Sequence, residues 1–323
     1  MKLFLTGGTG FFGKALLGYL AKKTSEGLLS VEVTVMSRNP DIFLKENPQF
    51  RNLTWLKFHK GNVLEFKSFP LEKDFTHILH AATESTVGPS LTPMQRFYQI
   101  VDGTKNALNF AIACPAKQFL LTSSGAIYGA QQEVPFEESM CNMPDVLDPE
   151  NAYGVGKRVA EHLCALYKKT YGIDYVIARC FAFVGEDLPD DAHFAIGNFI
   201  EDALVGRDIL VKSTGLQKRT YMYQADLAKW LFKILLSGKS GEAYNVGSDY
   251  EISIKDLAFL VRDVVNPKIQ VTILGKDSLD GRNSYTPSIK KAKSQLGLST
   301  AVSLEEAIAL TAKIKKKRKL MHV

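Results

Sequence analysis

The chain opens with Lys2-Leu3-Phe4-Leu5-Thr6-Gly7-Gly8-Thr9-Gly10-Phe11-Phe12-Gly13, and this stretch decides the fold class. Residues 2–6 are a short apolar run that leads into the glycine cluster, and residues 11–23 then carry apolar side chains at helical spacing. This pattern predicts a buried strand, a tight turn and an amphipathic helix. Gly7 permits the turn, Gly10 lets the backbone approach a ligand, and Gly13 allows the helix to pack closely.

A helix that follows such a turn offers free N–H groups and the positive end of its dipole, which favour binding of a pyrophosphate. The glycine turn therefore predicts a dinucleotide-binding site. A hairpin or linker turn is the alternative, and the flanking strand and helix argue against it.

Strands and helices alternate through the first half of the chain. Buried strands are predicted at residues 31–36, 53–58, 77–81, 118–123 and 175–178, and long helices at residues 94–113 and 152–171. Alternation predicts an α/β fold with a Rossmann-type, doubly wound parallel sheet. We assign residues 1–178 to this domain, with 224–248 returning to it. Residues 179–323 form a smaller substrate-binding lobe, mainly 179–223 and 249–312, and a basic tail.

In such folds ligands bind at the carboxyl ends of the strands, and the second strand ends with Ser37-Arg38. An acid is expected there for NAD, because a carboxylate accepts hydrogen bonds from the ribose hydroxyls. A hydroxyl and a guanidinium suit the 2′-phosphate of NADP instead. We therefore predict NADP, with NAD as the alternative; Asp41 lies too far along the chain to replace the acid.

Three polar side chains carry the predicted chemistry. Ser124 ends a strand, and Tyr153 and Lys157 share one face of a predicted helix because they are spaced i and i+4. A nearby ammonium, together with an oxidised nicotinamide, favours the phenolate form of Tyr153, and Ser124 can hydrogen-bond a substrate oxygen. This arrangement predicts hydride transfer. The alternative, a solvated surface pair, describes Tyr19 and Lys23, which have the same spacing.

The charge of the chain is concentrated near its end. The net charge is +6. Residues 313–319 carry six cations and no acidic residue, namely Lys313, Lys315, Lys316, Lys317, Arg318 and Lys319. The rest is balanced, so we expect no nucleic-acid partner, and the tail is expected to be a solvated, frayed helix end. Ser303 and Glu306 form a predicted capping box where that helix begins.

Length and composition suit one large core and a smaller lobe, since 46% of the 323 residues are hydrophobic. No apolar run approaches the roughly 20 residues of a membrane span, so we expect no membrane insertion. The chain begins directly with its first predicted strand, and we expect a cytoplasmic protein. The four cysteines show no metal-ligand spacing, so no metal site is predicted.

Several motifs follow one another in a recognisable order: the glycine turn, His80-Ala81-Ala82, Leu121–Gly129 (LTSSGAIYG), Tyr153–Lys157 (YGVGK), Arg179–Gly185 (RCFAFVG) and Arg219–Asp226 (RTYMYQAD). Together they resemble the extended short-chain dehydrogenase/reductases that act on nucleotide sugars, the epimerase/dehydratase family. The resemblance spans nearly the whole chain. It implies a catalytic triad of Ser124, Tyr153 and Lys157, and a homodimer formed through the helices at 94–113 and 152–171.

The resemblance also implies which residues meet the ligands. The predicted cofactor contacts are Thr6, Gly7, Gly10, Phe11, Phe12, Gly13, Ser37, Arg38, Asn62, Val63, Ala81, Ala82, Thr83, Tyr153 and Lys157. The predicted contacts with a nucleotide-sugar substrate are Ser124, Gly125, Asn198, Arg219 and Arg282, with Arg219 at the diphosphate. Asn62 stands where an Asp commonly meets the adenine, and Ala182 and Ile100 stand where the family usually has Asn.

The two residues after Ser124 predict the activity. Dehydratases of the family have an Asp-Glu pair there and sugar-acid decarboxylases keep a Glu, whereas this chain has Gly125-Ala126. Neither residue transfers a proton, so 4,6-dehydratase and decarboxylase chemistry are disfavoured. We expect reduction of a 4-keto-6-deoxy sugar by NADPH with Tyr153 as the acid; a 4-epimerase with retained NAD is the alternative. A catalytically quiet NADP-binding regulator is a further alternative, which the intact triad disfavours.

Overall fold

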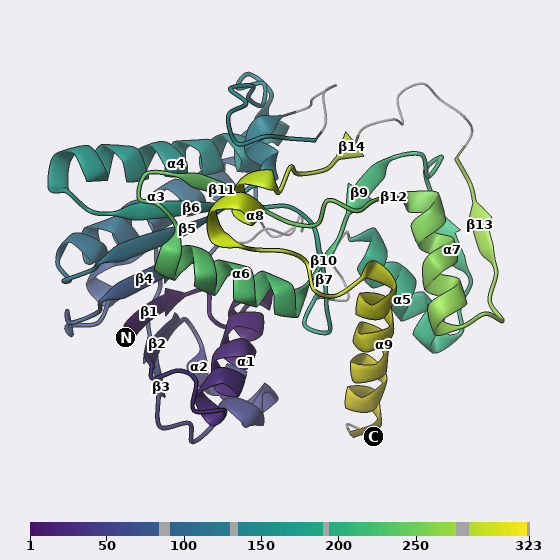
Figure 1. Ribbon diagram of the computed structural model, residues 1–323, viewed down its shortest axis with the longest axis horizontal. Coiled ribbons are helices and arrows are strands. Elements are labelled where there is room, and N and C mark those ends of the chain that lie inside the picture. Colours follow the sequence, from purple (N-terminus) through teal and green to yellow (C-terminus); the bar gives the residue numbers. More distant parts are fainter. Residues whose placement is uncertain (84–90, 130–134, 190–193, 276–283, 322–323) are drawn as a thin grey trace.

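The computed structural model describes residues 1–83, 91–129, 135–189, 194–275 and 284–321 (Figure 1). Its main element is a seven-stranded parallel sheet with the order β11-β6-β5-β4-β1-β2-β3. These strands are β1 (Lys2–Thr6), β2 (Glu32–Ser37), β3 (Leu56–Lys60), β4 (His77–His80), β5 (Gln118–Ser124), β6 (Tyr175–Cys180) and β11 (Ala243–Val246). The strand order reverses between β1 and β4, so the predicted Rossmann-type fold is confirmed. The third strand begins three residues later than the predicted residue 53.

Helices cover both faces of this sheet (Figure 1). The helices α3 (Pro93–Ile112) and α4 (Ala152–Tyr171) pack together on one face, and α1 (Phe11–Ser25) and α6 (Gln224–Ser237) pack together on the other. Because successive side chains of a strand point to opposite faces, Phe4 belongs to the core under α3 and α4, whereas Leu3 and Leu5 belong to the core under α1 and α6.

Short helices connect the strands and long helices of this sheet domain. They are α2 (Pro40–Glu46) and the 3-10 helices η1 (Pro48–Phe50), η2 (Phe66–Ser68), η3 (Gly125–Tyr128) and η4 (Pro149–Asn151). The helices α3 and α4 have clear local signals at one end each. Thr92 and Gln95 form a capping box at the start of α3, and Gly172 ends α4 in the left-handed conformation that glycine adopts at low cost.

A smaller lobe lies beyond the carboxyl ends of the strands (Figure 1). Its strands are β7 (Phe183–Val184), β8 (Ile209–Val211), β9 (Lys218–Thr220), β10 (Met222–Tyr223), β12 (Glu251–Ser253), β13 (Val271–Ile273) and β14 (Ser284–Tyr285). In the three-stranded sheet β12-β9-β14, the central strand is β9. The helices α5 (Ala195–Val205), α7 (Ile254–Val265) and α9 (Leu304–Met321) share a separate core with β7, β8, β10, β12 and β13.

One late segment packs differently from the sequence-based assignment. The helix α8 (Lys290–Leu296) contacts β11, and Ala292 and Leu298 belong to the core under α6. The sequence-based assignment places residues 289–298 in the lobe, because no local pattern in this segment indicates that it packs against the large sheet. The described chain therefore crosses between the sheet and the lobe more often than predicted.

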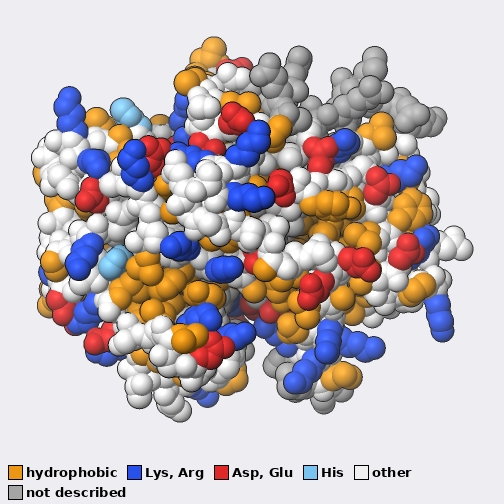
Figure 2. Space-filling model, viewed as in Figure 1, with side chains coloured by type: hydrophobic (Ala, Val, Ile, Leu, Met, Phe, Trp, Pro, Cys, Tyr) orange, Lys and Arg blue, Asp and Glu red, His pale blue; other side chains and the backbone are white. Residues whose placement is uncertain are grey.

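The basic tail is an ordered part of α9, so its prediction as a frayed end was wrong. Lys315 is only 6% exposed, and its Nζ lies 3.4 Å from the Leu188 carbonyl oxygen. Arg318 donates from Nη1 to the Glu186 carbonyl oxygen at 3.1 Å and to Asp187 Oδ1 at 3.0 Å. Figure 2 shows basic side chains gathered around the lower end of this helix. The partners lie about 130 residues earlier, which a local charge pattern does not reveal.

One of the two hydrogen bonds of the predicted capping box is found at the start of α9, where the Glu306 N–H donates to Ser303 Oγ at 3.2 Å. Among the helices of the described ranges, none combines the length and the apolar character needed to cross a membrane.

Candidate active site

The glycine turn between β1 and α1 has the geometry that its sequence predicts. Gly7 has φ of +75°, and a Cβ at this position would lie 2.5 Å from the backbone of Ala81. A Cβ on Gly13 would collide with the backbone of Gly8, so α1 packs closely against the turn. A Cβ on Gly10 would have only the Gly7 carbonyl oxygen nearby, at 3.5 Å, which leaves the turn open to a ligand. These three glycines fit the pyrophosphate of a dinucleotide.

This turn opens onto a cavity of about 450 Å³ at the carboxyl ends of β1, β2 and β4. Predicted cofactor residues line it, namely Gly7, Gly10, Ser37, Arg38, Asn62, Val63, Ala81, Ala82 and Thr83. Phe11 and Phe12 have a different place, because both rings pack against Phe183 of the lobe. Thr6 is buried, and its Oγ1 lies 2.8 Å from His80 Nδ1. The prediction missed Lys14, which lines the cavity from the first turn of α1.

The end of β2 gives the cavity its charge pattern. Ser37 is buried and its Oγ accepts from the Asn39 N–H at 3.4 Å, whereas Arg38 is exposed. Asp41 does not line the cavity, in agreement with the sequence-based expectation, but Glu46 of α2 does. A guanidinium and a carboxylate therefore both line the cavity.

Lys157 connects the cavity to the predicted catalytic residues. Its Nζ donates to the Thr122 carbonyl oxygen at 2.8 Å and to Thr83 Oγ1 at 3.1 Å. The residue is 3% exposed, and burial lowers the pKa of its ammonium to about 8. Since Thr83 also lines the cavity, Lys157 reaches the edge of the predicted cofactor site.

Ser124 and Tyr153 lie beside each other, close enough for the Ser124 hydroxyl to act on the pKa of the Tyr153 phenol. Burial raises the pKa of Tyr153 to about 12, and the nearby Ser124 hydroxyl opposes this rise. The expected lowering of this pKa by Lys157 is not found. The Lys157 Nζ lies 5.8 Å from the centre of the Tyr153 ring and donates to other oxygens, so desolvation dominates in this structure.

A second tyrosine, Tyr285 of β14, belongs to this cluster and was missed from the sequence. Its hydroxyl also lies close enough to Ser124 to be influenced by it. A Cβ on Gly125 would collide with this hydroxyl and would lie 2.8 Å from the ring of Phe181. Tyr285 is separated from Ser124 by about 160 residues, and no local pattern marks it.

The predicted substrate contacts are only partly gathered here. Arg219 of β9 is paired in register with Tyr285, and its guanidinium carbon lies 5.9 Å from the centre of the Tyr285 ring. Asn198 is exposed on α5, and its contact with a substrate stays a prediction. Arg282 lies outside the described residues.

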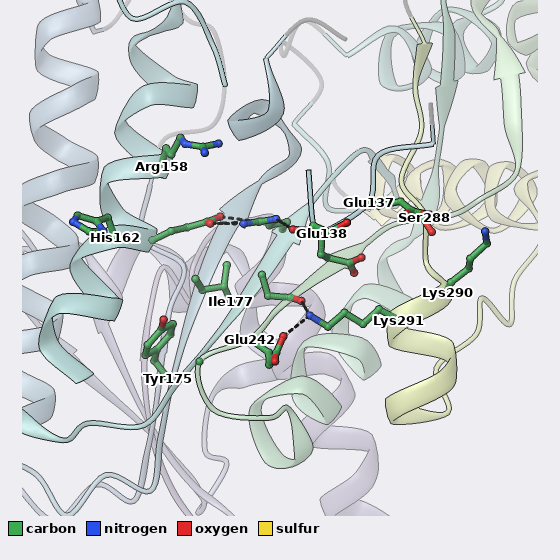
Figure 3. A pocket seen from close by; sticks show the side chains of 15 residues that line it. Glu137, Glu138, Arg158, His162, Tyr175, Ile177, Glu242, Ser288, Lys290 and Lys291 are labelled. Carbon is green, nitrogen blue, oxygen red and sulfur yellow. Dashed lines mark hydrogen bonds and ion pairs between the residues drawn. The ribbon is translucent and has the colours of Figure 1, made fainter. Parts of the chain in front are cut away.

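A separate cavity of about 670 Å³ lies on the β11 edge of the sheet, between α4 and α8 (Figure 3). Its walls carry charges of both signs that pair with one another. Arg179 pairs with Glu161 at 2.9 Å, and Lys291 points toward Glu242, with 2.7 Å between them. None of the three predicted catalytic residues lines this cavity, so we assign the chemistry to the first site.

Comparison with known proteins identifies the family. The profile of the NAD-dependent epimerase/dehydratase family matches residues 3–247. UDP-glucuronic acid decarboxylase 3 of Arabidopsis thaliana is 29% identical over 312 residues, which cover 96% of this chain and 87% of that protein. UDP-glucuronic acid decarboxylase 1 of Xenopus tropicalis is 29% identical over 313 residues, covering 96% and 71%.

Solved structures share the fold. The UDP-glucose 4-epimerase of Thermotoga maritima with UDP-glucose has a TM-score of 0.83 at 23% identity, covering 99% of this chain and all of that one. The RMD protein of Pseudomonas aeruginosa complexed with NADPH has a TM-score of 0.79 at 22% identity, covering 98% and 99%. With the glycine turn, the strand order and the match over residues 3–247, the chain belongs to the NAD-dependent epimerase/dehydratase family of extended short-chain dehydrogenase/reductases.

Proposed function

We propose that this protein reduces the 4-keto group of a nucleotide-linked 4-keto-6-deoxy sugar with NADPH. The observation that carries the proposal is the position of the Ser124 and Tyr153 hydroxyl groups beside each other, next to Gly125-Ala126. This cluster keeps the groups that a hydride transfer requires. It has no carboxylate at the two positions where the family's eliminating enzymes carry one.

Each residue of the cluster has a role in the proposed reaction. A bound NADPH supplies the hydride that the carbonyl carbon accepts. Tyr153 donates its phenolic proton to the carbonyl oxygen, and its raised pKa keeps that proton in place at neutral pH. Ser124 hydrogen-bonds the same oxygen as it gains negative charge, and Lys157 holds the Thr83 hydroxyl at the edge of the cofactor cavity.

The sequence relatives that decarboxylate UDP-glucuronic acid do not decide the activity. At 29% identity the family is shared, but the residues after Ser124 differ from the Glu that the family's decarboxylases keep. Gly125 and Ala126 have no group that transfers a proton. We therefore do not assign decarboxylation to this chain.

NADP is the proposed cofactor because Ser37 and Arg38 line the cavity at the end of β2. We expect the Arg38 guanidinium to pair with the 2′-phosphate. The test is a fluorescence titration of the purified protein with NADPH and with NADH. Arg38→Ala should weaken NADPH binding about tenfold and leave NADH binding unchanged. Lys45→Ala is the control, since Lys45 is exposed on the same helix-and-turn segment but does not line the cavity.

The activity itself is tested with a dTDP-linked 4-keto-6-deoxyhexose and NADPH. Loss of NADPH absorbance together with a reduced sugar supports the proposal. NAD that stays bound through purification, with interconversion of UDP-glucose and UDP-galactose and no net loss of cofactor, would instead establish the 4-epimerase. That alternative is favoured by the epimerase structures that align over the whole chain.

We also propose a homodimer formed through α3 and α4. These helices pack side by side and leave large apolar side chains exposed, among them Tyr98, Ile112 and Leu166. Light scattering of the purified protein measures its mass directly. We also propose that the protein is located in the cytoplasm.

A further inference from the structure

The turn that follows β7 is held by three separate elements of the fold. Asp187 lies at its centre and has a side chain that is only 9% exposed. Its backbone N–H donates to Gln224 Oε1 at 3.1 Å, and its Oδ2 accepts from Gln224 Nε2 at 2.9 Å. Its other oxygen, Oδ1, lies 3.0 Å from Arg318 Nη1 and 4.0 Å from Lys14 Nζ. One carboxylate thus joins α1, α6 and the end of α9.

The cations on this carboxylate belong to different parts of the molecule. Lys14 lines the predicted cofactor cavity, whereas Arg318 belongs to the basic tail and has no place in the cavity lining. Both contact the same oxygen, and Arg318 is closer by 1.0 Å. Because Arg318 is the closer cation, it forms the stronger ion pair with Asp187. The Lys14 ammonium stays 4.0 Å from the same carboxylate.

The tail holds the turn at further points. Arg318 also donates to the Glu186 carbonyl oxygen, and Lys315 donates to the Leu188 carbonyl oxygen. The Glu186 side chain accepts from the Tyr223 hydroxyl at 3.0 Å, and Lys319 pairs with Glu201 of α5. The backbone of residues 186–188 is therefore fixed from the carboxyl end of α9.

We propose that Arg318 is a positioning residue for the cofactor site: through Asp187 it fixes the turn at 186–188 and keeps the Lys14 ammonium available to the cofactor diphosphate. This inference rests on the proposed dinucleotide binding, but not on the identity of the sugar. It gives the basic tail a role inside the enzyme.

Three variants of the full chain test this role. Arg318→Met removes the charge and keeps the length of the side chain, and Arg318→Lys restores the charge. Lys317→Met is the matched control, because Lys317 is an exposed cation one residue earlier in the same helix. The first readout is the Kd for NADPH and for NADH, and the second is the midpoint of thermal unfolding.

Arg318→Met should raise the Kd of the preferred dinucleotide about threefold to tenfold, and Arg318→Lys should recover most of the loss. Lys317→Met should bind like the wild type. In a double-mutant cycle, Asp187→Asn combined with Arg318→Met should be no worse than the stronger single variant, because both changes break one contact. The KM for the cofactor should rise with the Kd, while kcat changes little.

The inference is overturned if Arg318→Met and Lys317→Met have the same Kd, or if Arg318→Met lowers only the unfolding midpoint. Failure of the proposed reductase is a separate result. A wild-type protein that binds a dinucleotide but reduces no keto sugar contradicts the reductase, and the Kd comparison still decides the role of Arg318.

Discussion

The Tyr285 hydroxyl occupies the place where a side chain on residue 125 would begin, since a Cβ built on Gly125 collides with it. The two residues are about 160 positions apart in the chain and come from different parts of the fold. Gly125 directly follows Ser124 at the end of β5, whereas Tyr285 lies on β14 of the lobe. A phenol from the lobe thus stands beside Ser124, where the family's eliminating enzymes carry a carboxylate.

This packing makes residue 125 intolerant of any side chain. Gly125→Ala should lower kcat/KM by about 100-fold, because either Tyr285 or the Phe181 ring must move. Tyr285→Phe keeps the ring and removes the hydroxyl beside Ser124, so a loss of about fivefold is expected. Tyr19→Phe is the control, because Tyr19 of α1 packs on Phe232 of α6, away from Ser124. Full activity of Gly125→Ala would show that the Tyr285 ring is not fixed here.

Tyr153→Phe removes the proposed acid and keeps the ring. We expect kcat to fall about 10²–10⁴-fold, while the Kd for the cofactor changes less than about twofold. Steady-state rates with the true substrate and a cofactor titration measure the two effects separately. Turnover close to that of the wild type would reject Tyr153 as the proton donor.

His80 should make the fold sensitive to acid. It is 1% exposed, its Nε2 has no hydrogen-bond partner among the described residues, and burial lowers its pKa to about 3. The folded protein keeps the imidazole neutral while the unfolded chain binds a proton below about pH 6.5, so stability is lost as the pH falls from about 6.5 toward 3. The slope is about 1.4 kcal/mol per pH unit for this group.

Urea unfolding at about pH 7 and about pH 5 measures that slope. His80→Gln should show a smaller loss of unfolding free energy on acidification than the wild type. His162→Gln serves as its control, because His162 is exposed on α4 and its removal should leave the slope as it is. An unchanged slope in His80→Gln would mean that other groups control the acid sensitivity.

Asp226 of α6 should be a major stabilising contact between the sheet and the segment that leads into α9. It is 3% exposed, and its Oδ2 accepts from the N–H groups of Ala301 at 2.8 Å and Val302 at 3.1 Å. Asp226→Ala leaves both donors without this acceptor and should lower the free energy of unfolding by about 3 kcal/mol. Asp263→Ala, which removes an exposed ion pair, should cost less than about 1 kcal/mol. Equal losses in the two variants would contradict the assignment.

The parts of the site that were predicted from sequence are those whose signal is local. Gly7 and Gly13 were identified because a strand and a helix flank them, and Tyr153 and Lys157 because the i, i+4 spacing places them on one helix face. Ser124 was identified because it ends a buried strand. The fold class followed from the alternation of these same elements.

The parts that were missed depend on distant partners. Tyr285 enters the site from a two-residue strand, which has no pattern of its own. The order of the tail depends on the contact of Arg318 with Asp187. The effect of Lys157 on the pKa of Tyr153 depends on the direction of the Lys157 ammonium, which donates to other oxygens. Packing, and not propensity, decides these three cases.

The three-stranded sheet β12-β9-β14 also has a consequence for biosynthesis. Its strands come from residues 218–220, 251–253 and 284–285, whereas β1 to β6 are complete by residue 180. Because a chain emerges from the ribosome beginning with its N-terminus, most of the nucleotide-binding half can fold while the strand with Tyr285 is still unsynthesised. The surroundings of Ser124 are therefore completed only after residue 285 has been made, and a nascent or prematurely terminated chain would contain β1 to β6 without the tyrosine that packs beside Ser124.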